Sequence, residues 1–446
     1  MVRKVPAFHE EPLMPPEYSA KQWMLVFYEE NSKANIDQYW KALGREAYAD
    51  YSQKVKVNGE VKEIAAASIA GAKTDSEKIS RLVEYCRKSL KDVNGRAITT
   101  QEREANKANR TTVDTLKRGT GSVQEINYAF AALATAAGFE ARLVKLADRG
   151  TFLFDPALRS AFLRNTFDIA VKVNSQWKFY DVTNPNLPAG MLSWREEGVP
   201  ALITDSKEPE FVTTPLLSSQ DSRIARVGTL KLSAEGALEG DLREIYMGNK
   251  AAEWRERFAT ANNTEREDDL RRELKSRFAD FELTNAKFNA VEDVTKPVGI
   301  LYHIRIEGYA QRTGKRLFIR PAYFQTGAGP WFTANTRQFP ICFDYPWSET
   351  DVVTIELPQG YQLDHPDAPH SLSFEPAGSY AVKILMPKPN IVEYHRQFVF
   401  GTDKPLMFDK KAYPAIKQIF DYVHEADSHM LTLKADAQTA TLPALQ

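Results

Sequence analysis

The stretch from Gly121 to Gly138 constrains the fold of this 446-residue chain more than any other part of it. It opens with Ser122 and Glu125 in the spacing of a capping box, in which each side chain accepts a hydrogen bond from a free backbone N–H at a helix start. A glycine at its end is typical of a helix terminus. Between these signals, apolar residues recur as on one helix face, at Val123, Ile126, Phe130, Leu133 and Ala137. The stretch therefore predicts a helix from 122 to 137.

The composition is that of a globular protein without a marked charge. Hydrophobic residues make up 43% of the chain and charged residues 26%, which are ordinary fractions for packed domains. The length allows roughly two or three domains. A formal net charge of −1 gives no support for nucleic acid or a membrane surface as a partner. No apolar run approaches the roughly 18 residues of a membrane span.

The sequence around the predicted helix resembles the transglutaminase-like superfamily, which has a papain-like fold. The family pattern is Gly-x-Cys-x-Asp/Glu, then a helix rich in Ala and Leu, then Gly-apolar-x-Ala-Arg leading into a strand. Here the last part reads Gly-Phe-Glu-Ala-Arg from Gly138 to Arg142. Counting back from Gly138 by the family spacing puts the catalytic Cys position at Val123. The resemblance thus implies an enzyme fold in which the nucleophile position holds a side chain that cannot ionise.

A second stretch, from Asn165 to Pro185, carries the rest of the resemblance. The family has a His at the start of one strand and an Asp, in Asp-x-Thr, at the end of the next strand. A short turn and a Trp lie between them, and Trp177 matches this Trp. On this alignment Asp168 stands at the His position, and Asp181, in Asp-Val-Thr, stands at the Asp position.

The Cys-His-Asp triad of the family therefore reads Val123, Asp168 and Asp181 in this chain. No histidine occurs between His9 and His303, so shifting the alignment by one or two residues restores no general base. The loss of both groups argues against transamidation, deamidation and peptide hydrolysis by a cysteine. We expect no catalytic residues and a pseudo-active site at these three positions.

Ser122 has two interpretations, as a helix cap and as a replacement nucleophile. The capping box with Glu125 already explains why a serine stands there. A nucleophilic serine also needs a base that is oriented by a third group, and the sequence offers none. We therefore interpret Ser122 and Glu125 as the helix cap at the site.

Asp168 and Asp181 also have two interpretations. As a like-charge pair, one of them would have a raised pKa, which suits acid–base work or the binding of a divalent cation. Alternatively each makes ordinary local bonds, with Asp181 capping a turn at Asn184–Pro185 and Asp168 pairing with Arg142 or Lys172. Structural networks perturb carboxyl groups as well, so the local bonds are the favoured interpretation.

Neither cysteine is a good replacement nucleophile. Cys86 shares the apolar face of a predicted helix with Ile79, Leu82 and Val83 and is expected to be a buried core thiol. Cys342 falls in a predicted strand, and neither cysteine has a histidine near it in sequence. A disulfide between them is not favoured, because they fall in different predicted domains.

Two segments carry metal-type side chains without the spacing of a metal site. Asp364 to His370 contains two prolines, which predict a turn between strands. His424 and His429 resemble a zinc-protease motif, but residues five apart on a helix point about 140° away from each other. We expect no metal and no cofactor.

The chain divides into three predicted regions. Residues 1–60 form a lead-in, with a strand near Met24–Tyr28 and a helix from about 36 to 51, and are interpreted as the remnant of an N-terminal β-sandwich domain plus a helix. Residues 61–208 form the transglutaminase-like domain, an α+β unit in which a helix packs against an antiparallel sheet. Its predicted elements are helices at 61–72, 74–90 and 122–137, a polar loop at 91–111, and strands near 139–147, 166–173 and 176–181.

Residues 222–430 form the third region, a β-rich C-terminal domain that ends in a helix. Apolar and polar residues alternate over several of its segments, which predicts an antiparallel β-sandwich-like domain. The closing helix is predicted from Tyr413 to Val423. Aromatic rings that gather in this region suit either the core of a sandwich, which is favoured, or a sugar- or peptide-binding platform; they are Trp331, Phe332, Tyr345 and Trp347.

Residues 1–30 have scattered charges and no apolar core, unlike a signal peptide. They resemble the closing strands of a β-sandwich that precedes this domain in a family of bacterial exported proteins. We therefore expect the chain to be a fragment of a longer protein. The resemblance implies an extracytoplasmic or periplasmic location.

The resemblance and its departures together predict a catalytically inactive transglutaminase-like protein. It would act as a binding or structural module, for peptide or glycan at the cell envelope. The alternative is a hydrolase or metal-dependent enzyme that uses Asp168 and Asp181 in a remodelled cleft. The expected partner is an unidentified peptide, protein or glycan, with no nucleic acid and no membrane span in this chain.

Overall fold

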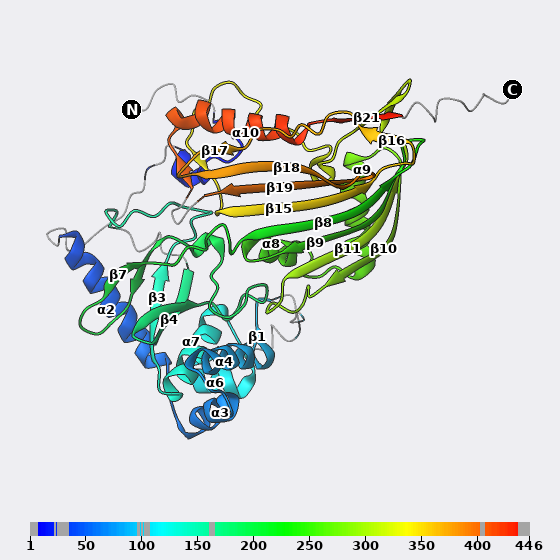
Figure 1. The fold of residues 1–446 in the computed structure, drawn as a ribbon. Coiled ribbons are helices and arrows are strands. Elements are labelled where there is room, and N and C mark those ends of the chain that lie inside the picture. The colour runs from blue at the N-terminus through cyan, green and yellow to red at the C-terminus, as the bar shows by residue number, and fades with distance from the viewer. Residues whose placement is uncertain are drawn as a thin grey trace. The chain divides into compact units, whose positions relative to one another are not determined.

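The computed structural model describes residues 8–21, 24, 35–95, 99, 101, 108–159, 166–401 and 406–435. The chain forms two compact units, whose ribbons are drawn in Figure 1. Unit 1 comprises Met1–His9 and Pro15–Leu216, and unit 2 comprises Glu10–Met14 and Leu217–Gln446. Residues 25–28 of the predicted first strand lie outside the described residues, as do parts of the predicted loop at 91–111.

The helices of unit 1 begin where side chains cap their free N–H groups. Asn35, Asn58, Thr74 and Ser122 each accept a hydrogen bond from a backbone N–H in the first turn of the helix that follows. The segment from Thr112 to Arg118 forms a helix that the sequence analysis did not predict. The helices are α1 (Glu17–Ala20), α2 (Ile36–Lys54), α3 (Gly59–Ile69), α4 (Asp75–Ser89), α6 (Thr112–Arg118) and α7 (Val123–Ala136).

Unit 1 contains a five-stranded antiparallel sheet with the order β5-β4-β3-β6-β7. Its strands are β3 (Glu140–Leu146), β4 (Thr166–Val173), β5 (Gln176–Tyr180), β6 (Pro200–Ile203) and β7 (Glu210–Thr213). A separate short parallel pair joins β1 (Lys91–Asp92) to β2 (Thr120–Gly121), directly before α7. The predicted α+β unit, with a helix against an antiparallel sheet, is confirmed.

Helix α7 is the central element of unit 1 and packs against β3 and β4 (Figure 1). It is buried on all sides from Ile126 to Ala134, as expected for a helix that is apolar around most of its circumference. Successive residues of β4 point to opposite faces of the sheet. Ile169 and Val171 therefore join the core around α7, whereas Ala170 joins a second core on the other face.

Unit 2 is built on an eight-stranded sheet with the order β10-β11-β9-β8-β15-β19-β18-β17. The pair β8–β15 is parallel, which differs from the predicted antiparallel arrangement, and the other pairs are antiparallel. The strands are β8 (Arg223–Leu232), β9 (Leu238–Tyr246), β10 (Phe281–Asn289), β11 (Val298–Ile306), β15 (Trp347–Glu356), β17 (Leu372–Ser373), β18 (Gly378–Lys388) and β19 (Ile391–Phe400).

Smaller elements complete unit 2. A four-stranded sheet has the order β12-β13-β21-β16, and β14 pairs with β20. Helix α10 lies along β18 (Figure 1), and its Phe420 ring contacts Phe398 and Phe400 with centroid distances of 6.0 and 5.1 Å. The remaining elements are β12 (Gln311–Thr313), β13 (Arg316–Ile319), β14 (Ile341–Cys342), β16 (Tyr361–Leu363), β20 (Met407–Phe408), β21 (Leu431–Ala435), α8 (Asn249–Arg257), α9 (Asn263–Arg277) and α10 (Tyr413–Asp427).

Both cysteines are free, as predicted. Cys86 is fully buried in the core around α7, and burial raises the pKa of its thiol to about 12. A thiol of that pKa is neutral at physiological pH and is a poor nucleophile. In the part of the chain that the structure describes, no helix is both long and apolar enough to cross a membrane.

Candidate functional site

The start of helix α7 carries the capping box. The Ser122 hydroxyl oxygen accepts from the Glu125 N–H at 3.3 Å, and Glu125 Oε2 accepts from the Ser122 N–H at 2.7 Å. Glu125 Oε1 also accepts from the backbone N–H of Asn109 at 3.2 Å. These bonds hold the first turn of the helix in place, and they leave the Ser122 side chain engaged as an acceptor.

Val123 is the first residue of α7, and 44% of its surface is exposed. This position lies at the positive end of the helix dipole. A cysteine there would have a lowered thiol pKa and a larger thiolate fraction. The isopropyl group of valine gains nothing from the dipole, because it has no proton to lose.

Asn127 links α7 to the end of β5. It lies one helical turn after Val123 on the same face of the helix and is almost fully buried. Its side-chain Nδ2 donates to Asp181 Oδ1 at 3.4 Å, and its Oδ1 accepts from the Val182 N–H at 3.1 Å. The first two turns of α7 therefore lie beside Asp181.

Asp181 follows the last residue of β5 and makes local bonds. Its Oδ1 accepts from the backbone N–H of Thr183 at 2.9 Å and from the Thr183 hydroxyl at 2.6 Å. The predicted cap at Asn184–Pro185 was misplaced, since the bonds of Asp181 close the preceding turn at Thr183. The physical reason is reach, because a carboxylate most easily accepts from the N–H two residues ahead of it.

Asp168 lies in β4, opposite Val144 of β3. Ile169 pairs with Tyr180 in the ladder between β4 and β5, so the same register places Asp168 opposite Asp181. Asp168 is only 2% exposed, and its Oδ2 has no hydrogen-bond partner among the described residues. An acceptor without a partner at this depth is costly when the carboxyl group is ionised.

The predicted pairing of Asp168 with Arg142 or Lys172 is wrong. Arg142 instead pairs with Glu140 at 2.9 Å and Asp205 at 3.2 Å. Lys172 also pairs with Glu140, at 3.5 Å. Both basic side chains are partly exposed, and they bind carboxylates near the surface rather than the buried carboxyl group of Asp168.

Glu196 is the third carboxyl group of this region, and no motif in the sequence indicates it. It lies in the short 3-10 helix η2 (Trp194–Glu196) and is 9% exposed. Burial and then the charges of Asp181 and Asp148 raise its pKa to about 8, against the opposing effect of Arg195. Since η2 carries no recognisable motif, only the folded chain reveals this neighbour.

Burial also raises the pKa of Asp168 well above its usual range, and the charges of Glu196 and Asp181 raise it further. The surroundings of Asp168 therefore favour the protonated form of its carboxyl group. Across the ranges that the structure describes, no group of three or more His, Cys, Asp and Glu side chains is arranged to hold a metal ion.

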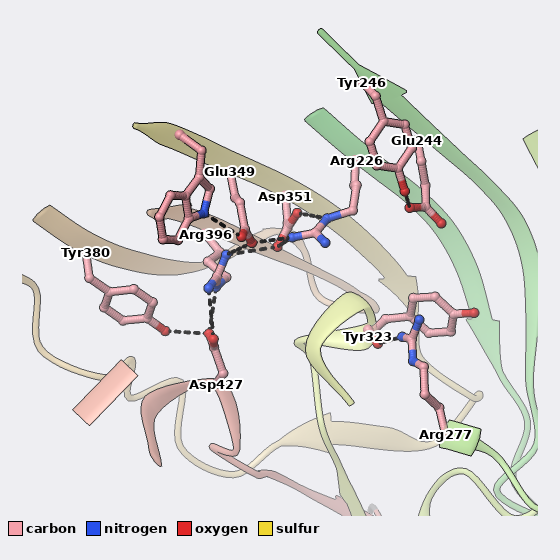
Figure 2. Close-up of polar contacts among 11 residues, drawn as sticks. Arg226, Glu244, Tyr246, Arg277, Tyr323, Glu349, Asp351, Tyr380, Arg396 and Asp427 are labelled. Atoms are coloured by element: carbon pink, nitrogen blue, oxygen red, sulfur yellow. Dashed lines mark hydrogen bonds and ion pairs between the residues drawn. The ribbon is translucent and has the colours of Figure 1, made fainter. Parts of the chain in front are cut away.

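Unit 2 contains a buried ion network, defined here as Arg226, Glu349, Asp351, Arg396 and Asp427 (Figure 2). Asp351 stands opposite Arg226 and Arg396 in the sheet register. Arg226 donates to Asp351 at 2.6 and 3.2 Å and to Glu349 at 2.8 Å. Arg396 donates to Asp427 at 2.7 and 2.9 Å and to Glu349 at 2.9 Å. The network thus links three neighbouring strands to α10.

Ion pairs with arginine keep Glu349 ionised in this network. Burial opposes its charge, but Arg226 and Arg396 outweigh burial and hold its pKa at about 2. For Asp427 the balance is reversed, and burial raises its pKa despite the guanidinium of Arg396. The Tyr380 hydroxyl donates to Asp427 at 2.8 Å (Figure 2). Each carboxylate therefore has the donors that a charge at this depth requires.

Four aromatic residues of unit 2 were candidates for either a core or a binding platform, and three of them are core residues, as the favoured interpretation predicted. Phe332, Tyr345 and Trp347 are at most 4% exposed. Trp331 differs, because 49% of its surface is exposed.

Two regions of the chain match known families. Residues 62–161 match the transglutaminase-like superfamily, and this range includes α7 and β3. Residues 315–433 match DUF3858, a domain of unknown function with a solved structure. A search of curated proteins finds no match.

Two solved structures are similar to this chain. A candidate protease from Parabacteroides distasonis is 12% identical with a TM-score of 0.47, and the alignment covers 88% of this chain and 58% of that chain. A candidate cysteine protease from Cytophaga hutchinsonii is 12% identical with a TM-score of 0.21, and the alignment covers 38% of this chain and 48% of that chain. This chain thus spans 58% and 48% of the lengths of the two structures.

Proposed function

We propose that this protein, whose residues 62–161 form a transglutaminase-like domain, is catalytically inactive and acts as a binding or structural module. Val123 at the first position of α7 carries the proposal. Every cysteine-type reaction of this fold begins with a thiolate that attacks a carbonyl carbon. Valine has neither a lone pair nor a proton for that step, so no acyl intermediate forms.

Asp168 supports the proposal from the side of the general base. A histidine at this position would take up a proton near neutral pH. At Asp168, burial and then the charges of Glu196 and Asp181 raise the pKa of the carboxyl group, which favours its protonated form and weakens it as a base. Val123 therefore provides no nucleophile, and Asp168 provides no base of the kind that a histidine would be.

The surroundings of the missing groups support a retained binding role. The capping box at Ser122 and the bonds from Asn127 to Asp181 and Val182 keep the frame of the site intact. Val123 stays exposed at the surface of that frame. The ligand we propose is a peptide or glycan of the bacterial cell envelope, with the protein in an extracytoplasmic or periplasmic location, which cell fractionation tests.

A second candidate function rests on the carboxyl groups. Asp168 and Glu196 have raised pKa values beside Asp181. Carboxyl groups in unlike environments are the pattern of hydrolases that use one acid as proton donor and another as base or nucleophile. A hydrolase that uses Asp168 and Asp181 is therefore the alternative to be tested.

One set of assays separates the two functions. The wild-type chain is tested for amine incorporation into casein, for glutamine deamidation and for peptide and glycan hydrolysis, below and above neutral pH. We expect no turnover above that of the Asp168→Asn/Asp181→Asn double variant. Asp205→Asn is the matched control, because Asp205 is a carboxylate of the same unit that is bonded to Arg142. Turnover in the wild type and control that disappears in the double variant would establish the hydrolase instead.

A further inference from the structure

A cavity of about 210 Å³ lies in unit 2 beside the buried ion network. It is bounded by β19, by α10 and by the segment that follows the 3-10 helix Tyr323–Gln325. At about 30 Å³ per water, this volume corresponds to roughly seven water molecules. It is smaller than the pockets of drug-sized ligands, so it suits one small ring or the end of a longer chain.

Hydrogen-bonding groups line one part of the cavity. Arg226 uses Nε and Nη2 for its bonds within the network, and its Nη1 makes no hydrogen bond within the described residues. The side-chain amide of Gln325 also belongs to the lining. The imidazole of His424 adds a donor and an acceptor. The cavity therefore offers both donors and acceptors, as a ligand with hydroxyl groups requires.

Four aromatic rings are part of the lining, those of Phe324, Trp331, Phe398 and Phe420, and Trp331 is the exposed one among them. The Trp331 ring is supported from below by Trp347, with the ring planes 15° apart and the centroids 5.7 Å apart. It also contacts Phe420 at 5.1 Å. A supported flat indole gives a large contact area at a small cost in conformational entropy. Its electron-rich face attracts the weakly positive C–H groups of a ligand.

The charges around the cavity are already balanced. Lys250 lies over the Trp347 ring at 5.6 Å and interacts with Glu349. Three basic side chains therefore face three carboxyl groups: Arg226, Arg396 and Lys250 against Glu349, Asp351 and Asp427. A charged ligand would lose its hydration here without meeting an unpaired opposite charge. A neutral ligand avoids that cost.

We propose that this cavity binds one neutral sugar unit of a saccharide. The C–H face of the sugar packs on Trp331, and its hydroxyl groups bond to Arg226 Nη1, Gln325 and His424. This inference deepens the binding role proposed above and rests on it only for the choice of glycan as a ligand class. It concerns unit 2 alone and does not depend on whether unit 1 catalyses a reaction.

The test is a binding titration of the full chain by calorimetry, with ligand-observed NMR for weak binders. The probes are neutral sugars: glucose, galactose, mannose, xylose, N-acetylglucosamine, N-acetylgalactosamine and their β- and α-linked disaccharides. We expect at least one to bind at millimolar concentration or tighter. Trp331→Ala should weaken that binding up to roughly tenfold, the range of an aromatic contact. Gln325→Ala should weaken it severalfold.

Leu385→Ala is the matched control, because Leu385 is 47% exposed in the same unit and does not line the cavity. The affinity of the Leu385→Ala variant for the bound sugar should equal that of the wild type. Trp331 supports neighbouring rings, so each variant is first compared with the wild type by circular dichroism and thermal unfolding. If Trp331→Ala is misfolded, Gln325→Ala and His424→Ala carry the test.

Three outcomes would overturn the inference. They are no binding of any neutral probe, binding only of the charged sugars glucosamine or glucuronate, and unchanged affinity in folded cavity variants. None of these would affect the proposal for unit 1, which fails only if the wild type shows the turnover described above. The two proposals therefore succeed or fail separately.

Discussion

Arg396 binds Asp427 through two parallel hydrogen bonds, from Nε to Oδ1 at 2.7 Å and from Nη2 to Oδ2 at 2.9 Å. Arg396 lies on β19 and Asp427 is the last residue of α10. Both side chains are buried, with exposed fractions of 4% and 9%. This bidentate pair fastens the end of the helix to the sheet.

Replacing Arg396 by Met should destabilise the protein by about 3–5 kcal/mol, because it leaves Asp427 buried without its cationic partner. Urea unfolding followed by tryptophan fluorescence measures the change. Arg305→Met is the control, since Arg305 is 41% exposed and pairs with Glu239 and Glu307 at the surface; it should cost less than about 1 kcal/mol. Equal costs for the two variants would contradict the role assigned to the buried pair.

Replacing Ser122 by Ala should cost about 1 kcal/mol of stability, because it removes the acceptor for the Glu125 N–H. Ser122→Gly should cost only a few tenths of that. Thermal unfolding measures both. A fluorophosphonate probe followed by mass spectrometry should leave Ser122 unmodified, and a labelled Ser122 would show that it is a nucleophile rather than a cap.

The pKa of Glu196 predicts how stability depends on pH. In the folded chain this pKa is about 8, against an ordinary value of 4.5. Between these two values the folded state holds a proton that the unfolded chain has released. The contribution of Glu196 to stability is therefore highest below about 4.5 and falls as the pH rises towards about 8, by at most about 1.4 kcal/mol per pH unit. Asp168 contributes in the same direction.

Glu196→Gln removes this dependence, because its amide does not titrate. The difference in unfolding free energy between the variant and the wild type should grow in favour of the variant as the pH rises through this window. Urea unfolding at the two ends of the window measures it. A difference that does not vary with pH would mean that Glu196 titrates normally in the folded protein.

Introducing Cys at Val123 and His at Asp168 tests whether these positions correspond to the catalytic Cys and His of the family. The thiol introduced by Val123→Cys would be exposed at a helix start, so iodoacetamide should alkylate it faster than Cys86, which is buried. Adding Asp168→His should increase that rate further if the imidazole reaches the thiol. Mass spectrometry of timed samples gives both rates. Identical rates in the single and double variants would show that the two positions do not face each other.

The sequence predicted the elements of unit 1 whose signals are local. The helix after Ser122 carries its own cap, its own apolar stripe and a terminal glycine. The strands β4 and β5, which contain Asp168 and end just before Asp181, are joined by a short turn that fixes their register. These signals lie within a few residues of the structure they specify, so one sequence is enough to read them.

The carboxyl group of Glu196 and the buried ion network could not be predicted in this way. The network partners Arg226, Asp351 and Arg396 come from distant parts of the sequence and meet only through strand register. One of the two ladders is the parallel pair β8–β15, whose long connection leaves no local signal. In a strand where polar and apolar residues alternate, a charged residue is predicted to be exposed to solvent as long as the neighbouring strands are unknown.

The segment Glu10–Met14 belongs to unit 2, although the chain on both sides of it belongs to unit 1. Glu11 accepts from the N–H groups of Gln338 and Phe339 at 2.8 and 3.1 Å, and the Leu13 carbonyl accepts from the Cys342 N–H at 2.7 Å. A fragment cut at Leu217 would therefore lack part of its own fold. Anyone who dissects this protein to study the second unit alone should supply residues 10–14 as a fused or separate peptide.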